Sequence, residues 1–219
     1  MQFSAIQGYD TIKQRLIHMA RTRQVPHAQL WGGPVGNANL PLALAFTTYL
    51  NCQNPQPSDA CGQCASCTQM HKLVHPDVKF VFPVAATKQV AAKDAVSTSF
   101  MPSWRTFLQE QPYGTISDWG HYLGVENKLL SIAKEEAKHI LQYVNLQAFG
   151  DAYQVLWLWL PEHMHPTAAN ALLKVIEEPP PRTLFLLISH QPDRVLATIR
   201  SRAQQISIPA FTDQALAES

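Results

Sequence analysis

The chain has 219 residues, of which 46% are hydrophobic and 15% are charged, enough to build one ordinary domain or one domain with a large insertion. No apolar stretch approaches the roughly 20 residues of a membrane span, and the N-terminus lacks the residue order of a signal peptide. We therefore expect a cytoplasmic protein with no membrane partner. The formal net charge of +1 neither indicates nor excludes nucleic-acid binding, because a local basic patch can hide in a neutral total.

The first third of the chain predicts alternating helices and strands. Residues 11–22 carry apolar side chains at helical spacing and predict an N-terminal helix. Residues 27–33, "HAQLWGG", predict a short buried strand that runs into a glycine-containing loop. Residues 40–51 predict the helix after that loop, and residues 75–82, "HPDVKFVF", predict a further strand.

All four cysteines of the chain fall within sixteen residues, in the pattern CxxxxxxxxCxxCxxC. Four thiolates around one ion is the arrangement that structural zinc prefers, and two-residue gaps let neighbouring sulfurs turn toward a common point. Disulfide pairing is the alternative, but a reducing compartment disfavours it and such close spacing is awkward to bridge. The nearby His71 and His75 are weaker ligand candidates. The predicted ligands of a closed, structural zinc site are Cys52, Cys61, Cys64 and Cys67.

Residues 84–126 have weak helical or strand patterning but are rich in aromatic side chains. So many aromatics argue against disorder, and we predict an insertion that packs on the body of the protein as a small satellite core. A surface on which single-stranded nucleic acid stacks, helped by Lys88 and Lys93, is the less favoured alternative. The aromatics are Trp104, Phe107, Tyr113, Trp119 and Tyr122.

The rest of the chain again alternates predicted helices and strands. An amphipathic helix begins at Lys134, with its charges opposite an apolar face. The apolar run "YQVLWLWLP", stopped by Pro161, is typical of a strand buried on both faces of a parallel sheet. The alternation predicts an α/β fold with helices covering a mostly parallel sheet. The predicted elements are helix 134–144, strand 153–160, helix 167–178, strand 183–189, helix 193–202 and strand 205–208.

Three separated blocks of the sequence together resemble the bacterial DNA polymerase III clamp-loader AAA+ family. The block "AANALLKVIEEPPPRTLFLLIS" followed by "TIRSRAQ" carries the most specific likeness. The loop block "HAQLWGGPVG" and the four-cysteine insert with "HPDV" lie in the same order as in that family. The likeness covers about residues 4–83 and 132–210 and leaves the aromatic insertion outside it.

The resemblance also implies a domain organisation. It implies an AAA+ type P-loop fold as a core domain over residues 1–210, with the zinc module at 52–67 and the insertion at about 84–126. The family continues into a lid and a helical collar, whereas this sequence stops at "TDQALAES". We therefore expect a fragment in which residues 211–219 begin the lid, and from which the rest of the lid and the collar are absent.

The glycine-containing loop departs from the phosphate-binding pattern GxxxxGK[ST]. In that pattern small residues let backbone amides cradle phosphate, the lysine neutralises charge and the hydroxyl holds magnesium. Here Gly33 and Gly36 remain. The second motif glycine is replaced by Ala38, the lysine by Asn39 and the hydroxyl residue by Leu40. We expect this loop to be empty and ATP not to be bound by this subunit.

The acidic pair of a working ATPase is missing as well. Aligned through "NALLK", the places of the pair at the end of the buried strand are Trp159 and Leu160, which can neither order magnesium nor polarise water. Glu162 follows Pro161 and is a poor substitute. Ser189 matches the place of the family's polar nucleotide sensor, and we expect a structural role for it.

Arg202 matches the arginine of the family's SRC motif, which reaches across an interface to the nucleotide of the neighbouring subunit. Ala203 replaces the cysteine of the motif and changes neither charge nor reach. An arginine that caps its own helix is the alternative, and it would be preferred for Arg202 or Arg200 taken singly. The resemblance implies that Arg202 is an arginine finger acting in trans.

Within the family, the sequence is most similar to the delta-prime subunits, which do not hydrolyse ATP. The resemblance implies a pentameric ring with the motor subunits and the delta subunit, acting on the sliding clamp and primed DNA in replication. No catalysis is expected from this chain alone, which would be a component of a DNA-directed DNA polymerase III holoenzyme. An ATP-hydrolysing motor subunit with a degenerate site is the alternative function, and a zinc-dependent DNA-binding module working alone ranks last.

Overall fold

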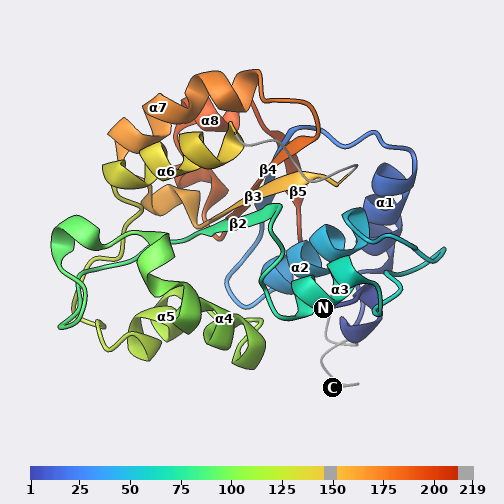
Figure 1. Ribbon diagram of the computed structural model, residues 1–219, viewed down its shortest axis with the longest axis horizontal. Helices are drawn as coiled ribbons and strands as arrows, with labels where there is room; N and C mark the ends of the chain where they lie inside the picture. Colours follow the sequence, from blue (N-terminus) through green and yellow to red (C-terminus); the bar gives the residue numbers. More distant parts are fainter. Residues whose placement is uncertain (146–151, 212–219) are drawn as a thin grey trace.

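One five-stranded sheet organises the protein, and its strands are all parallel, in the order β2-β3-β4-β1-β5 (Figure 1). The computed structural model describes residues 1–145 and 152–211, so the predicted start of a lid at 212–219 lies outside the described residues. The predicted α/β architecture is confirmed. The strands are β1 Ala28–Gly32, β2 Val78–Val81, β3 Gln154–Trp159, β4 Thr183–Ser189 and β5 Gln204–Ser207.

Helices cover both faces of the sheet, because a parallel sheet exposes apolar side chains on each side. The first five helices pack on one face, and α6 to α8 pack on the other (Figure 1). The helices are α1 Asp10–Arg21, α2 Asn39–Leu50, α3 Ala65–His71, α4 Met101–Glu110, α5 Ile116–Tyr122, α6 Lys134–Val144, α7 Pro166–Glu177 and α8 Ala197–Arg200.

Strand β3 lies inside the sheet, between β2 and β4, and every one of its residues is buried. Trp157 and Trp159 join the core on the side of α1 to α5, whereas Leu156 and Leu158 join the core under α6 to α8. Successive side chains of a strand point to opposite faces of the sheet, and in β3 the side chains on both faces are apolar. The continuous apolar run therefore supplies both cores at once.

The aromatic segment between β2 and α6 forms α4 and α5 and packs on the body, as predicted. Its aromatics extend the main core and do not form a separate satellite. Trp104 stacks on Phe82 at 4.2 Å and lies 4.9 Å from Trp159, measured between ring centroids. The segment joins the main core because Trp159, the last residue of β3, offers a large apolar ring on which Trp104 packs. Trp104 and Trp119 are 0% exposed, so neither ring can stack on nucleic acid.

Proline residues mark both ends of α7. Pro166 begins α7, and three prolines follow at its C-terminal end. The predicted helix over 193–202 is wrong, because only the short helix α8 forms there, preceded by a turn at Pro192–Arg194. Val195 is extended between the two, and this places its side chain, 2% exposed, in the core under α7.

Trp119→Ala should destabilise the protein by about 3–5 kcal/mol. The indole is fully buried, and its Nε1 donates a hydrogen bond of 2.8 Å to the Pro83 carbonyl, which the variant would leave without this donor. Tyr122→Ala is the matched control in the same helix, because Tyr122 is 37% exposed and should cost much less. Urea denaturation midpoints measure both, and equal losses would contradict the assignment of the segment to the main core.

Candidate functional site

The glycine-containing loop lies between β1 and α2, at the carboxyl edge of the parallel sheet. Open α/β sheets bind ligands at this edge. The loop is held on two sides, because Gly33 donates from its backbone to the Ser189 carbonyl of β4, and Ile208 donates to the Gly32 carbonyl. Gly36 has a φ of +80°, a conformation that favours glycine. The turn of a phosphate-binding loop therefore persists in the backbone.

The Asn37 side chain fills the inside of this loop. Its Oδ1 accepts a hydrogen bond of 3.0 Å from the backbone N–H of Asn39, and its Nδ2 donates one of 3.0 Å to the Ile208 carbonyl. Asn37 is only 4% exposed. A Cβ on Gly33 would lie 1.9 Å from Asn37 Nδ2 and 2.1 Å from the Ile208 oxygen. One backbone amide at the helix start, of the kind that cradles phosphate, is thus already bonded within the chain.

Asn39 stands where a phosphate-binding loop has its lysine. Its Nδ2 donates a hydrogen bond of 3.2 Å to the Ser189 carbonyl, and the residue is 1% exposed. Leu40, in the place of the magnesium-binding hydroxyl, is 2% exposed and belongs to the core. The two positions that would handle charge are therefore used to fasten α2 to β4 and to the core.

Tyr9, which the sequence did not single out, lies against the same loop. Its hydroxyl donates a hydrogen bond of 2.9 Å to the Pro209 carbonyl, and its ring meets Phe211 edge to face at a centroid distance of 5.1 Å. Burial raises the pKa of Tyr9, while the backbone N–H of Ala38 acts on it in the opposite direction. Tyr9 therefore approaches the loop amides from outside, as Asn37 does from inside. Tyr9 belongs to no recognisable motif, because it is distant in sequence from both the loop and Pro209.

The end of β3, where an ATPase carries its acidic pair, is apolar and closed. Trp159 is 0% exposed and packs among the aromatics of α4, and Leu160 is 1% exposed with a left-handed φ of 56°. Glu162 is used elsewhere, because its Oε1 accepts backbone hydrogen bonds from His190 at 3.0 Å and Gln191 at 3.1 Å. This carboxylate fixes the turn after β4.

Ser189 serves the same turn as Glu162. Its hydroxyl accepts a hydrogen bond of 3.0 Å from the Gln191 backbone N–H, and the residue is fully buried at the end of β4. Its carbonyl receives the hydrogen bonds from Gly33 and Asn39. The backbone and the side chain of Ser189 are thus both engaged in hydrogen bonds that hold the loop and the turn, which fits the structural role expected for it.

Arg202 lies just before β5, at the edge of the sheet opposite to the loop. Ile208, which directly follows β5, contacts the loop, so the four residues of this strand separate Arg202 from it by more than about 10 Å at ~3.3 Å per residue. Its Nε donates a hydrogen bond of 3.0 Å to Glu177 Oε2 at the end of α7. Arg200 instead contacts Asp193 at 3.2 Å. Arg202 therefore lies away from the glycine-containing loop of its own chain.

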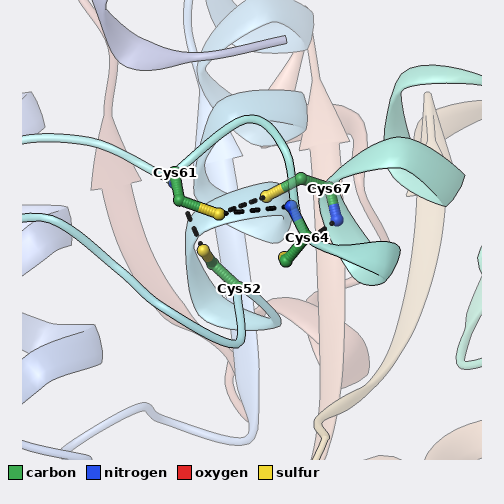
Figure 2. Close-up of side chains that lie close together, drawn as sticks. All are labelled: Cys52, Cys61, Cys64 and Cys67. Atoms are coloured by element: carbon green, nitrogen blue, oxygen red, sulfur yellow. Dashed lines mark hydrogen bonds between the residues drawn. The ribbon is translucent and has the colours of Figure 1, made fainter.

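The four cysteines come together next to α3 (Figure 2). All four Sγ atoms lie within 4.8 Å of one another, and those of Cys61 and Cys67 are 3.9 Å apart. A tetrahedral ion with metal–sulfur distances of about 2.3 Å places its ligands about 3.8 Å apart. Backbone N–H groups of Cys61, Cys64 and Cys67 point at Sγ atoms of the preceding cysteines at 3.3–3.5 Å. The donor set and its spacing fit a metal ion.

The two histidines after the cysteines lie outside this cluster. The ring of His75 is buried between a contact to Ser66 Oγ at 3.0 Å and one from the Asp77 backbone N–H at 3.2 Å, so it orders the turn into β2. His71 is exposed at the end of α3. This geometry agrees with the prediction that the four cysteines, and neither histidine, are the metal ligands.

The thiols of Cys52, Cys61 and Cys67 differ in acidity. Backbone N–H groups of Gln63 and Cys64 lower the pKa of the Cys61 thiol to about 6. Burial raises the pKa of Cys52 and of Cys67 above the ordinary thiol value. Four neighbouring thiolates repel one another, and a divalent cation is what allows all four to be deprotonated together.

No helix among the described residues is long and apolar enough to cross a membrane.

The parallel α/β fold is shared with a solved protein structure. A solved structure of a DNA polymerase III gamma subunit-related protein from Thermotoga maritima superposes with a TM-score of 0.50 at 15% sequence identity, covering 91% of this chain and 47% of that one. The model of the family described as "DNA polymerase III, delta subunit" matches residues 8–212. The chain therefore belongs to the DNA polymerase III delta-subunit family, and within it is delta-prime-like.

Curated relatives give the same placement. The DNA polymerase III subunit delta' of Pseudomonas aeruginosa is 30% identical over 85% of this chain and 44% of its own length. The delta' subunit of Escherichia coli is 28% identical over 87% of this chain and 45% of its own, and subunit tau of Bacillus subtilis is 23% identical over 98% and 30%. The chain spans less than half the length of these relatives.

Gly33→Ala should destabilise the protein by about 1–3 kcal/mol beyond the cost of Gly36→Ala. The added methyl group at residue 33 meets a backbone oxygen at 2.1 Å, which cannot swing aside as the end of a flexible side chain can. At Gly36 there is open space, so the control carries only the left-handed backbone cost of about 1–2 kcal/mol. Thermal unfolding of both variants measures the difference, and equal losses would show that Asn37 and Ile208 do not close the loop.

Proposed function

We propose that this chain is the non-hydrolysing, delta-prime-like subunit of a DNA polymerase III clamp loader, which supplies Arg202 to the ATP site of a neighbouring subunit. The observation that carries the proposal is the arrangement of the two edges of the sheet. At the carboxyl edge the loop is closed by Asn37 and the magnesium positions are apolar. At the other edge an arginine stands at the surface, 32% exposed.

The chemical role of Arg202 follows from its charge and its shape. A guanidinium stays protonated, and its planar fork of N–H groups matches the oxygens of a transferring phosphoryl group. Supplied in trans, it offsets the charge that develops in the transition state and makes hydrolysis depend on assembly. The proposed partners are the motor subunits and the delta subunit in a pentameric ring, with the sliding clamp and primed DNA reached through the complex.

The four-cysteine cluster is proposed to hold a structural zinc ion. Zinc is the metal that four thiolates in tetrahedral spacing select, and a site closed by four sulfurs has no position for a reacting water. Because Cys52 follows α2 and Cys67 lies in the first turn of α3, the ion would join these two helices. The proposed role is therefore to brace the fold.

Arg202→Ala in the full-length protein should lower ATP turnover in the reconstituted clamp loader. At the one adjoining site the loss should be about 10³-fold, because a trans arginine contributes that much or more to phosphoryl transfer. The complex should still assemble, since the Arg202–Glu177 pair is exposed and worth about 0–1 kcal/mol. Steady-state ATPase and size-exclusion chromatography are the measurements.

Arg200→Ala is the matched control, because it removes a guanidinium from α8 that contacts Asp193 instead. It should leave turnover near the wild-type value. Unchanged turnover in Arg202→Ala would remove the proposed role of the residue. Magnesium-dependent binding of ATP by the isolated protein at micromolar affinity would favour the alternative, a motor subunit with a degenerate active site.

The protein should contain one zinc ion per chain, and Cys61→Ser should lose it. Loss of a structural metal belongs to the largest single-site effects, so we expect a destabilisation on the order of 4 kcal/mol or more. His71→Ala is the control and should keep both the zinc and the stability. Atomic absorption and thermal unfolding measure these quantities, and a fully folded Cys61→Ser variant without metal would contradict the bracing role.

A further inference from the structure

The guanidinium of Arg202 is held by its own chain at two atoms. Its Nε donates to Glu177 Oε2 at 3.0 Å, and its Nη1 donates to the Thr198 carbonyl at 2.9 Å. A guanidinium has five N–H donors, and within the part of the chain that the structure describes no hydrogen bond engages the two N–H groups of Nη2. Helices α7 and α8 supply the two acceptors and pack against each other (Figure 1). The side chain is thus fixed near its base while its far end remains available.

The position of Glu177 has no explanation in the stability of its own helix. It is the last residue of α7, where the negative end of the helix dipole disfavours a carboxylate. The ion pair is open to solvent, with exposed side-chain fractions of 32% for Arg202 and 58% for Glu177, so its contribution to folding is small. A charge that is unfavourable for the helix and nearly neutral for folding has one evident effect, which is to orient Arg202.

The pairing is also selective. Arg202 and Arg200 have different carboxylate partners among residues 1–145 and 152–211. Arg202 pairs with Glu177, and Arg200 pairs with Asp193. Glu178, the next residue along, is also exposed, and the described hydrogen bonds of the Arg202 side chain do not include it. Neighbouring carboxylates of the same helix end therefore differ in whether they touch the guanidinium.

We propose that Glu177 is a positioning residue that holds Arg202 in the orientation in which it reaches the neighbouring subunit's nucleotide. This inference rests on the proposed trans role of Arg202. A side chain that is already ordered loses less rotational freedom when it meets its target, so a preset orientation favours the transition state of the neighbour's hydrolysis. Glu177 touches no reacting group in this proposal and acts only through Arg202.

Glu177→Ala in the reconstituted clamp loader should lower kcat for ATP about three- to tenfold at the adjoining site, with little change in KM, because ordering one long side chain is worth about that factor. Glu177→Gln keeps an oxygen that can accept from Nε and should lose less. Glu178→Ala is the matched control and should behave as wild type. Co-elution with the motor subunits checks that assembly is unchanged.

The double variant Arg202→Ala/Glu177→Ala separates positioning from a general structural role. If Glu177 acts through Arg202, the double variant has the turnover of Arg202→Ala alone; multiplied losses would overturn the proposal. Faster hydrolysis in Glu177→Ala would also overturn it, since Glu177 would then restrain the arginine. If Arg202→Ala lowers turnover while Glu177→Ala does not, only the positioning proposal fails. If Arg202→Ala has no effect, the trans role itself fails.

Discussion

Burial of both faces of the parallel sheet is the constraint on which the rest of the structure depends. Strand β3 satisfies this constraint because it carries apolar side chains on both faces, and so it contributes to both hydrophobic cores. The same requirement explains the end of this strand. With Trp159 and Leu160 there, the strand end is hydrophobic, and Trp104 of α4 packs on Trp159.

The sequence predicted the fold wherever one local property decides the outcome. The unbroken apolar run predicted a fully buried β3, and cysteine spacing predicted which four sulfurs meet, because each signal lies in adjacent residues. The short helix α8 was predicted too long, because the burial of Val195 overrides the helical preference of its segment. The aromatic segment was placed on the body, but its continuity with the core depends on Trp159, which is distant in sequence.

The candidate site shows the same division. The expected absence of a lysine, a hydroxyl and an acidic pair rests on a comparison of neighbouring residues with a motif, so it could be predicted from the sequence. The closure of the loop by Asn37 and Tyr9 could not, because it depends on Ile208 and Pro209, which reach the loop only after the last strand has been placed. The pairing of Glu177 with Arg202 was missed for the same reason, since α7 and α8 meet only in the folded chain.

The hydrogen bond from Asn39 to the Ser189 carbonyl has an evolutionary consequence. Restoring lysine at this position alone would place an ammonium group at a site that is 1% exposed and has no phosphate to neutralise it, which is costly. Restoring the acidic pair alone would put carboxylates among tryptophans. Each of these substitutions is unfavourable until the others are present, so under the proposed function no single substitution would give this chain a working nucleotide site.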